Sequence, residues 1–155
     1  MLLCGVIIAG AVFMFFNKGN GGEKPAAINE ITEFESLNLR ISGMRGSEEY
    51  EIISSGEKSE ISYYQIKYIN GNDERELRKS AVCNTSEVID ILNVCKAGKW
   101  NGFHGKHPKG VLDGRMFTLS ASVNGGVKLS AEGSENFPKN YNTFESWLST
   151  KLYNE

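Results

Sequence analysis

Two histidines are the residues of this sequence that are best suited to bind a metal ion. His104 and His107 lie three positions apart, and Cys95 or Asp113 could complete a ligand set with them. The pair belongs to a glycine-rich segment that also carries lysines, and no third ligand follows at a spacing typical of metal sites. We therefore expect solvent-exposed loop histidines and no bound metal.

The candidate nucleophiles have little support in the sequence. Ser134 lacks the G-x-S-x-G pattern of many serine hydrolases, and nothing in the sequence connects it to a histidine. Cys95 falls on the apolar side of a predicted helix, where a thiol packs in the core and is not activated. We therefore predict no nucleophilic residue and no cofactor.

Paired carboxylates are a third kind of candidate. Asp113 and Glu132 flank the last predicted hairpin and could face each other across its open end. An acid–base pair needs surroundings that separate its two pKa values, which a sequence does not reveal. Because Asp113-Gly114 is also typical of a turn, we predict no catalytic residue here.

An aromatic segment that begins at Trp100 is the feature most suggestive of binding. Trp100 and Phe103 either cover the core or line a recognition surface with the turn over residues 134–141. Aromatic and arginine side chains are common anchors in binding surfaces. The candidate ligand-binding residues are Trp100, Phe103, His104, Asp113, Arg115, Asn136 and Tyr141.

Hydrophobic periodicity predicts the elements that position these side chains. Alternating apolar and polar residues, or short apolar runs between turns, indicate six strands. A period of 3.6 residues and a capping pair at Asn84 and Glu87 predict a helix over residues 84–98. Asn142 and Glu145 are the expected capping pair of a final helix. The predicted strands are residues 37–41, 50–53, 61–69, 77–83, 117–123 and 127–131.

The order ββββ-α-ββ-α predicts an α+β domain. Short turns such as Asn70-Gly71 join successive strands, so we expect a mainly antiparallel sheet of about six strands. One sheet face should meet water and the other should be covered by both helices. Residues 99–110 are expected to form a loop. Cys83 and Cys95 would lie too far apart along a helix for a disulfide, so we expect two buried thiols and regard a bridge as the alternative.

Residues 1–16, MLLCGVIIAGAVFMFF, form an unbroken apolar run. An uncleaved membrane anchor fits this run best, although a full span needs about 20 residues. A cleaved signal peptide and a buried core helix are the alternatives. Cys4 follows a leucine and precedes twelve more apolar residues, so it is a poor match to the lipidated cysteine of a lipoprotein. Residues 17–30 read as a flexible linker, and residues 31–155 as one domain.

The remaining expectations concern location and partners. Lys18 mildly favours a cytoplasmic domain, but a short anchor with almost nothing before it usually sends the following domain outward. We therefore expect the domain to face outside the cell membrane, where it could meet a protein or cell-envelope partner. The chain has 155 residues and a formal charge of −2. This near-neutral balance argues against nucleic acid, which needs a basic surface.

The C-terminal part resembles a small domain of unknown function in bacterial exported or lipoprotein-like proteins. Its residues are a DG-x-x-aromatic strand at residues 113–117, an Asn-Gly-Gly hairpin, and a Gly-Ser-Glu-Asn-Phe-Pro turn at residues 133–138 before a helix. Glu135 departs from the pattern by standing between Ser134 and Asn136. The resemblance implies a shared hairpin–turn–helix unit and implies no activity.

Taken together, these features predict a membrane-tethered extracytoplasmic binding or interaction module, and not an enzyme. One alternative is a hydrolase, with or without a metal, that uses His104, His107 and Asp113. The other alternative is a secreted inhibitor or an immunity-type protein.

Overall fold

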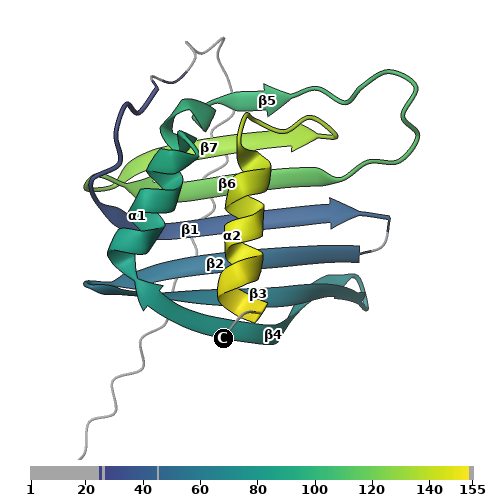
Figure 1. Ribbon diagram of the computed structural model, residues 1–155. Coiled ribbons are helices and arrows are strands. Elements are labelled where there is room, and N and C mark those ends of the chain that lie inside the picture. Colours follow the sequence, from purple (N-terminus) through teal and green to yellow (C-terminus); the bar gives the residue numbers. More distant parts are fainter. Residues whose placement is uncertain (1–24, 26, 45, 154–155) are drawn as a thin grey trace, which may run out of the picture.

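The computed structural model describes residues 25, 27–44 and 46–153. Within them, seven strands form one sheet in the order β4-β3-β2-β1-β6-β7-β5, and helices α1 and α2 lie across the same face (Figure 1). The α+β class and the placement of both helices on one face are confirmed. The elements are β1 (Phe34–Gly43), β2 (Gly46–Ser55), β3 (Lys58–Ile69), β4 (Asn72–Asn84), α1 (Thr85–Val94), a 3-10 turn (Ala97–Trp100), β5 (Phe103–Gly105), β6 (Met116–Val123), β7 (Val127–Ser134) and α2 (Tyr141–Tyr153).

The prediction of a mainly antiparallel sheet of about six strands is only partly met, because the described residues add a seventh strand that runs parallel to its neighbour. Residues 99–110 were expected to form a loop, but β5 pairs in parallel with β7, with Phe103 opposite Ala131. The sheet is therefore mixed and has seven strands within the described residues. A three-residue strand is too short to show a two-residue period, and its partner lies 28 positions along the chain, which explains why the sequence pattern did not reveal it.

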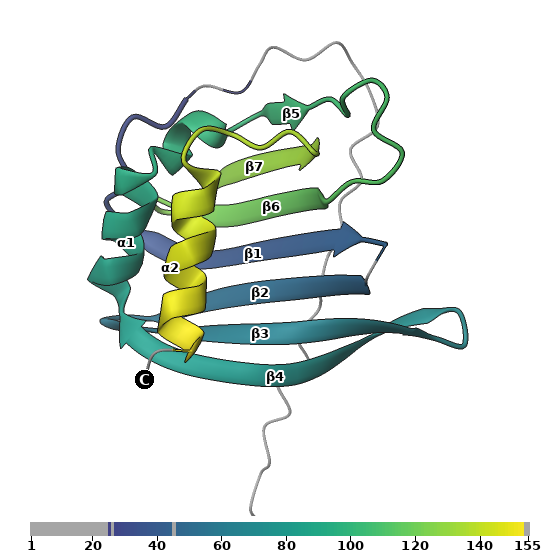
Figure 2. The ribbon, with the colours of Figure 1, turned by 45° about the vertical axis from the view of Figure 1, so that its right-hand side comes forward.

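Helix α1 carries the chain from one edge of the sheet to the other. The chain leaves β4 at one edge, crosses the covered face in α1, and enters β5 at the opposite edge (Figures 1 and 2). The predicted capping pair is present, because the backbone N–H of Asn84 donates to the Glu87 carboxylate over 3.0 Å. This cap fixes the point at which the meander ends and the crossing begins.

Two helix ends differ from the sequence-based expectation. After α1, Lys96 adopts the left-handed conformation with φ 57°, and Gly98 does not. Gly98 instead lies against the chain before β1, where a Cβ atom would stand 2.0 Å from the carbonyl oxygen of Ile28. Before α2, Asn140 has φ 66°, and Glu145 bonds to Arg115 in place of capping the helix.

The core lies between the sheet and the two helices. Leu37, Leu39 and Ile41 of β1 point into it, as the alternation predicted, together with Val88 and Leu92 of α1. The core continues beneath α2, and its remaining members there include Phe117, Leu119, Leu129, Tyr141, Phe144 and Leu148. A sheet covered on one face by both helices leaves its other face, here called the outer face, for polar side chains.

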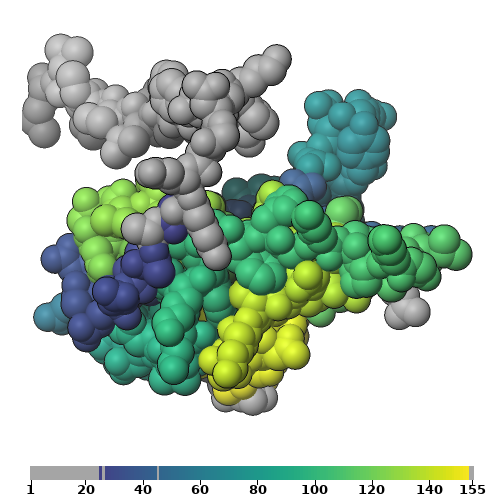
Figure 3. All heavy atoms as spheres, turned by 90° about the horizontal axis from the view of Figure 1, so that it is seen from above, coloured from purple at the N-terminus to yellow at the C-terminus, as the bar shows by residue number. Residues whose placement is uncertain are grey.

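The outer face carries a network of ion pairs centred on the β3–β4 hairpin. Arg40 of β1 pairs with Asp73 of β4 over 2.6 Å, although two strands separate them in the sheet. Arg75 contacts Glu49 over 2.9 Å and lies over the Tyr64 ring. The hairpin tip stands away from the outer face (Figure 3), and these contacts join Asp73 and Arg75, which lie near the tip, to β1 and β2.

Two asparagines fasten the chain before β1 to the domain. The side chain of Asn93 in α1 accepts from the backbone N–H of Ile31 over 3.0 Å and donates to its carbonyl over 2.8 Å. The Asn124 side chain binds the same segment: its amide oxygen accepts from the backbone N–H groups of Thr32 and Glu33, and its amide nitrogen donates to the carbonyl of Glu30. The entry of the chain into β1 is therefore fixed.

The apolar run over residues 1–16 lies outside the described residues. Among the residues that the structure does describe, no helix is both long enough and apolar enough to cross a membrane.

Cys83 and Cys95 are free thiols and both are buried, as the sequence predicted. Burial raises the pKa of each thiol, and the Glu87 carboxylate raises that of Cys83 further.

We expect a Cys4→Ser variant, in which these two are the remaining cysteines, to react with Ellman's reagent only after unfolding, because little thiolate forms in the core. Titration of the native protein that consumes one equivalent or more would contradict this.

Candidate functional site

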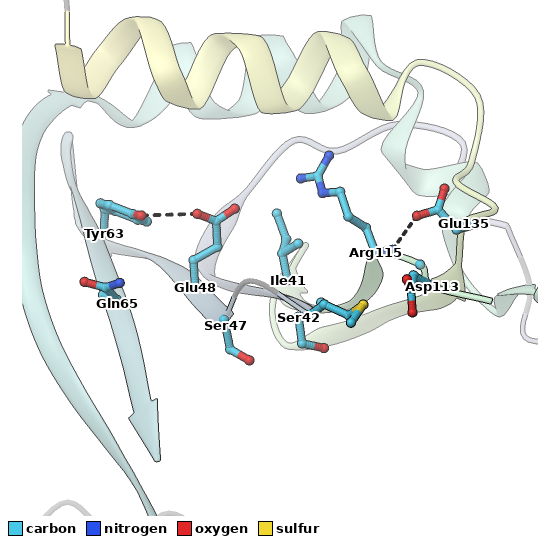
Figure 4. Close-up of a pocket in the computed structure, with 13 residues that line it drawn as sticks. Ile41, Ser42, Ser47, Glu48, Tyr63, Gln65, Asp113, Arg115 and Glu135 are labelled. Carbon is cyan, nitrogen blue, oxygen red and sulfur yellow. Dashed lines mark hydrogen bonds between the residues drawn. The ribbon is translucent and has the colours of Figure 1, made fainter. Parts of the chain in front are cut away.

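A cavity of about 630 Å³ opens at the end of the sheet where β1 turns into β2 (Figure 4). Two other segments, the start of β6 and the turn after β7, complete its wall. The register explains the meeting, because Ser42 of β1 pairs with Ser47 of β2 on one side and with Met116 of β6 on the other. The polar and charged lining residues are Ser42, Ser47, Glu48, Tyr63, Gln65, Asp113, Arg115 and Glu135.

Glu48, Tyr63 and Gln65 form one wall. Glu48 shares the helix-covered face of β2 with Tyr50 and Ile52, so alternation places a carboxylate where the strand otherwise presents core residues. The Tyr63 hydroxyl donates to Glu48 Oε2 over 3.1 Å. Burial, followed by the Glu48 charge, raises the pKa of Tyr63, which keeps the phenol protonated as the donor. Glu48 Oε1 accepts no hydrogen bond from the described residues.

Asp113, Arg115 and Glu135 form the opposite wall (Figure 4). The backbone N–H of Arg115 donates to the Glu135 carboxylate, which ties the start of β6 to the turn after β7. The Arg115 guanidinium pairs with Glu145 of α2, and that bond raises its pKa. The Glu145 carboxylate thus holds Arg115 beside α2, so this guanidinium is not free to bind an anionic ligand.

Among the described residues, the lining of the cavity has an excess of negative charge. Glu48, Asp113 and Glu135 line it together with the Arg115 guanidinium, which Glu145 already compensates. In the described part of the chain, the oxygens that remain available include Glu48 Oε1 and the exposed Asp113 carboxylate. This distribution favours a ligand group with hydrogen-bond donors and a positive charge.

Tyr141 lies beneath this region in the core. Its ring is 1% exposed and stacks on Phe137 with the ring centroids 4.8 Å apart. The hydroxyl is buried and has no hydrogen-bond partner among the described residues. Burial, followed by the Glu145 charge, raises the pKa of Tyr141, so the phenol stays neutral.

The sequence-predicted binding residues do not share one surface. Asp113 and Arg115 line the cavity, and their role in binding stays a prediction. Trp100 is 2% exposed and lies, like Tyr141, in the core, which agrees with the alternative that it covers the core. Phe103 and His104 belong to β5 at the sheet edge and are not among the residues that line this cavity. Asn136 donates its amide to the carbonyl of Lys106 over 3.3 Å.

Sequence reasoning missed Glu48, Tyr63, Gln65 and Glu135. One signal could have found Glu48, because it occupies the same phase as Tyr50 and Ile52 in a strand whose other phase is polar except for Ile53. An acidic residue on the apolar phase of a strand is unusual unless it serves a site. No local sequence pattern indicates that β2 and the turn after β7 lie side by side.

The chemistry considered for the histidines and carboxylates also needs correction. His104 Nδ1 lies 2.6 Å from Glu132, so Glu132 faces β5 while Asp113 lines the cavity. His107 Nδ1 lies 2.7 Å from the Ser134 hydroxyl, a connection that the sequence did not show. No group of three or more His, Cys, Asp or Glu side chains in the described part of the chain is arranged to hold a metal ion.

The fold and the site define a small α+β domain, with helices on one face of a mixed sheet and an acidic cavity at one end of that sheet. Comparisons with protein-family models, with curated proteins and with solved structures find no match to this chain.

Proposed function

We propose that this protein is a membrane-tethered extracytoplasmic binding module whose cavity accepts a positively charged group of its ligand. The observation that carries the proposal is the cavity itself, because its volume of about 630 Å³ falls in the range of small-molecule sites. The described part of its lining supplies acidic oxygens, and the Arg115 guanidinium there is already paired with Glu145. A primary amine, or the lysine or arginine side chain of a protein partner, has the matching chemistry.

The position of the cavity suits a tethered protein. The chain enters β1 at Phe34 and leaves it at Gly43, at the opposite end of the strand (Figure 1). Gly43 lines the cavity. Ten extended residues span about 33 Å. A tether made of residues 1–16 and the linker that follows would therefore hold the domain from the end opposite the cavity. The outward orientation rests on the apolar run and stays part of the proposal.

Of the alternatives, the metal-dependent hydrolase receives less support from the geometry. A metal-dependent hydrolase built on His104, His107 and Asp113 would need these side chains to face one ion. His104 instead bonds to Glu132, and both ring nitrogens of His107 are engaged by Ser134 and the carbonyl of Val111. An inhibitor or immunity-type protein would bind a protein partner, and a partner that presents a lysine or arginine would use the same cavity.

The proposal is tested by titrating the full chain in detergent with short peptides that contain one central lysine or arginine. Matched peptides with acetyl-lysine or citrulline at that position serve as neutral probes. We expect the charged peptides to bind more tightly than the neutral ones and to weaken as salt rises. Equal affinity for charged and neutral peptides, or no binding of either, would overturn the proposal.

Glu48→Gln is expected to weaken binding of the lysine peptide by about tenfold, because a charge-assisted hydrogen bond becomes a neutral one. Glu51→Gln is the matched control, since Glu51 lies on the outer face of the same strand and contacts Arg75 over 3.4 Å. Isothermal titration calorimetry measures both variants. A Glu48→Gln affinity equal to that of Glu51→Gln would remove Glu48 from the site.

A further inference from the structure

His107 and Ser134 form a pair that neither the cavity nor its proposed ligand requires. His107 Nδ1 lies 2.7 Å from Ser134 Oγ, and His107 Nε2 lies 2.8 Å from the carbonyl oxygen of Val111. A carbonyl only accepts hydrogen bonds, so Nε2 carries the ring proton. In the neutral imidazole the lone pair of Nδ1 then faces the Ser134 hydroxyl, which donates to it. This is the arrangement of a nucleophile, a base and a group that orients the base.

The local fold holds both partners of the pair. Ser134 is the last residue of β7 and pairs with Met116 of β6, which fixes its backbone. Glu135 follows with φ 49°, so the chain turns sharply after the serine. Gly114 lies against the imidazole, since a Cβ atom there would be 3.0 Å from His107 Cε1 and 2.6 Å from Glu135 Cγ. The loop that carries His107 thus packs closely on the turn that carries Ser134.

The pair also borders a space that can hold a substrate. Gly114, which lies against the imidazole, and Glu135, which directly follows Ser134, both line the cavity of about 630 Å³. Ser134 is half-buried and His107 is exposed, so a small molecule can reach both. A nucleophile and a base beside a cavity are the elements from which an uncharacterised active site is recognised.

We propose that Ser134 and His107 hydrolyse small carboxylic esters at the rim of the cavity. Ser134 Oγ attacks the ester carbonyl carbon while its proton passes to His107 Nδ1. The bond between that carbon and the alcohol oxygen breaks, and His107 returns the proton to the departing alcohol. Water then attacks the acylated serine and gives one proton to His107, which passes it to Ser134 Oγ as the acid leaves. The products are an acid and an alcohol, and water is the single co-substrate.

The test uses the full chain in detergent with a fluorophosphonate probe, and mass spectrometry locates the modified residue. We expect the label on Ser134, no label at that position in Ser134→Ala, and at least about a hundredfold slower labelling in His107→Gln, the range of a general base. Ser130→Ala is the matched control, because Ser130 is an exposed serine of the same strand, and it should label at the parent rate. Hydrolysis of p-nitrophenyl acetate should follow the same order.

A structural role of the hydrogen bond is separated from catalysis by a second variant and a second measurement. Thermal melting shows whether His107→Gln remains folded. If it unfolds, Gly114→Ala replaces it, because the added Cβ displaces the imidazole and should slow labelling by about tenfold or more. Absence of label on Ser134 in the parent protein, or an unchanged rate in a folded His107→Gln, overturns the proposal. Neither result bears on peptide binding in the cavity, which is measured separately.

Discussion

Trp100→Ala is expected to lower the free energy of unfolding by about 3 to 5 kcal/mol. Trp100 is 2% exposed and packs in the core against α2. Its indole lies 6.2 Å from the Tyr141 ring and 6.1 Å from the Phe144 ring, measured between centroids. The substitution removes these contacts and leaves a cavity. It also removes the hydrogen bond from Trp100 Nε1 to the carbonyl of Lys139, which spans 3.0 Å.

Urea unfolding followed by circular dichroism measures this loss. Trp147→Ala is the matched control, because Trp147 is half-buried on α2 and its truncation leaves less unfilled space. We expect the control to lose less than half as much stability. Equal losses would mean that Trp100 does not close the core. If Trp100→Ala is stable but binds peptide poorly, Trp100 takes part in binding, as the sequence first suggested.

The periodicity of the sequence predicted those parts of the fold that local pattern determines. The alternation at Leu37, Leu39 and Ile41 gave the buried face of β1 correctly. Asn70 and Gly71 both have positive φ, as their hairpin position requires. The stripe that contains Val88 and Leu92 gave the buried side of α1. Each of these features depends on neighbours within a few residues.

Features that depend on distant pairing were not predictable. Strand β5 is defined by its parallel pairing with β7, in which Gly105 lies opposite Gly133. A parallel strand of three residues has no local sequence pattern from which it could be predicted. That pairing also brings His107 to Ser134, 27 positions away. The cavity shows the same division. Asp113 and Arg115 were predicted from the sequence as binding residues. Glu48 lies near them because the register of β1 with β2 and β6 brings the start of β2 close to the start of β6.

Gly133→Ala is the second substitution with a large expected effect, a loss of about 3 kcal/mol in the free energy of unfolding. The backbone carbonyl of Asn136 turns back onto the paired glycines of β5 and β7. A Cβ atom on Gly133 would lie 2.2 Å from that oxygen and 2.8 Å from Phe117 Cε1. Relief would require the turn after β7, which carries the wall of the cavity, to move. Thermal and urea unfolding measure the loss.

Two further glycines make this prediction specific. Gly43→Ala is the control, because its Cβ would meet the nearest atom, the carbonyl oxygen of Gly114, at an ordinary 3.6 Å, and we expect a change below about 1 kcal/mol. Gly105→Ala should cost as much as Gly133→Ala, since its Cβ would also lie 2.2 Å from the Asn136 oxygen. Because both push the same carbonyl, the double variant should lose less than the sum. Full additivity would show that the two glycines make separate contacts and that the carbonyl is not their shared obstacle.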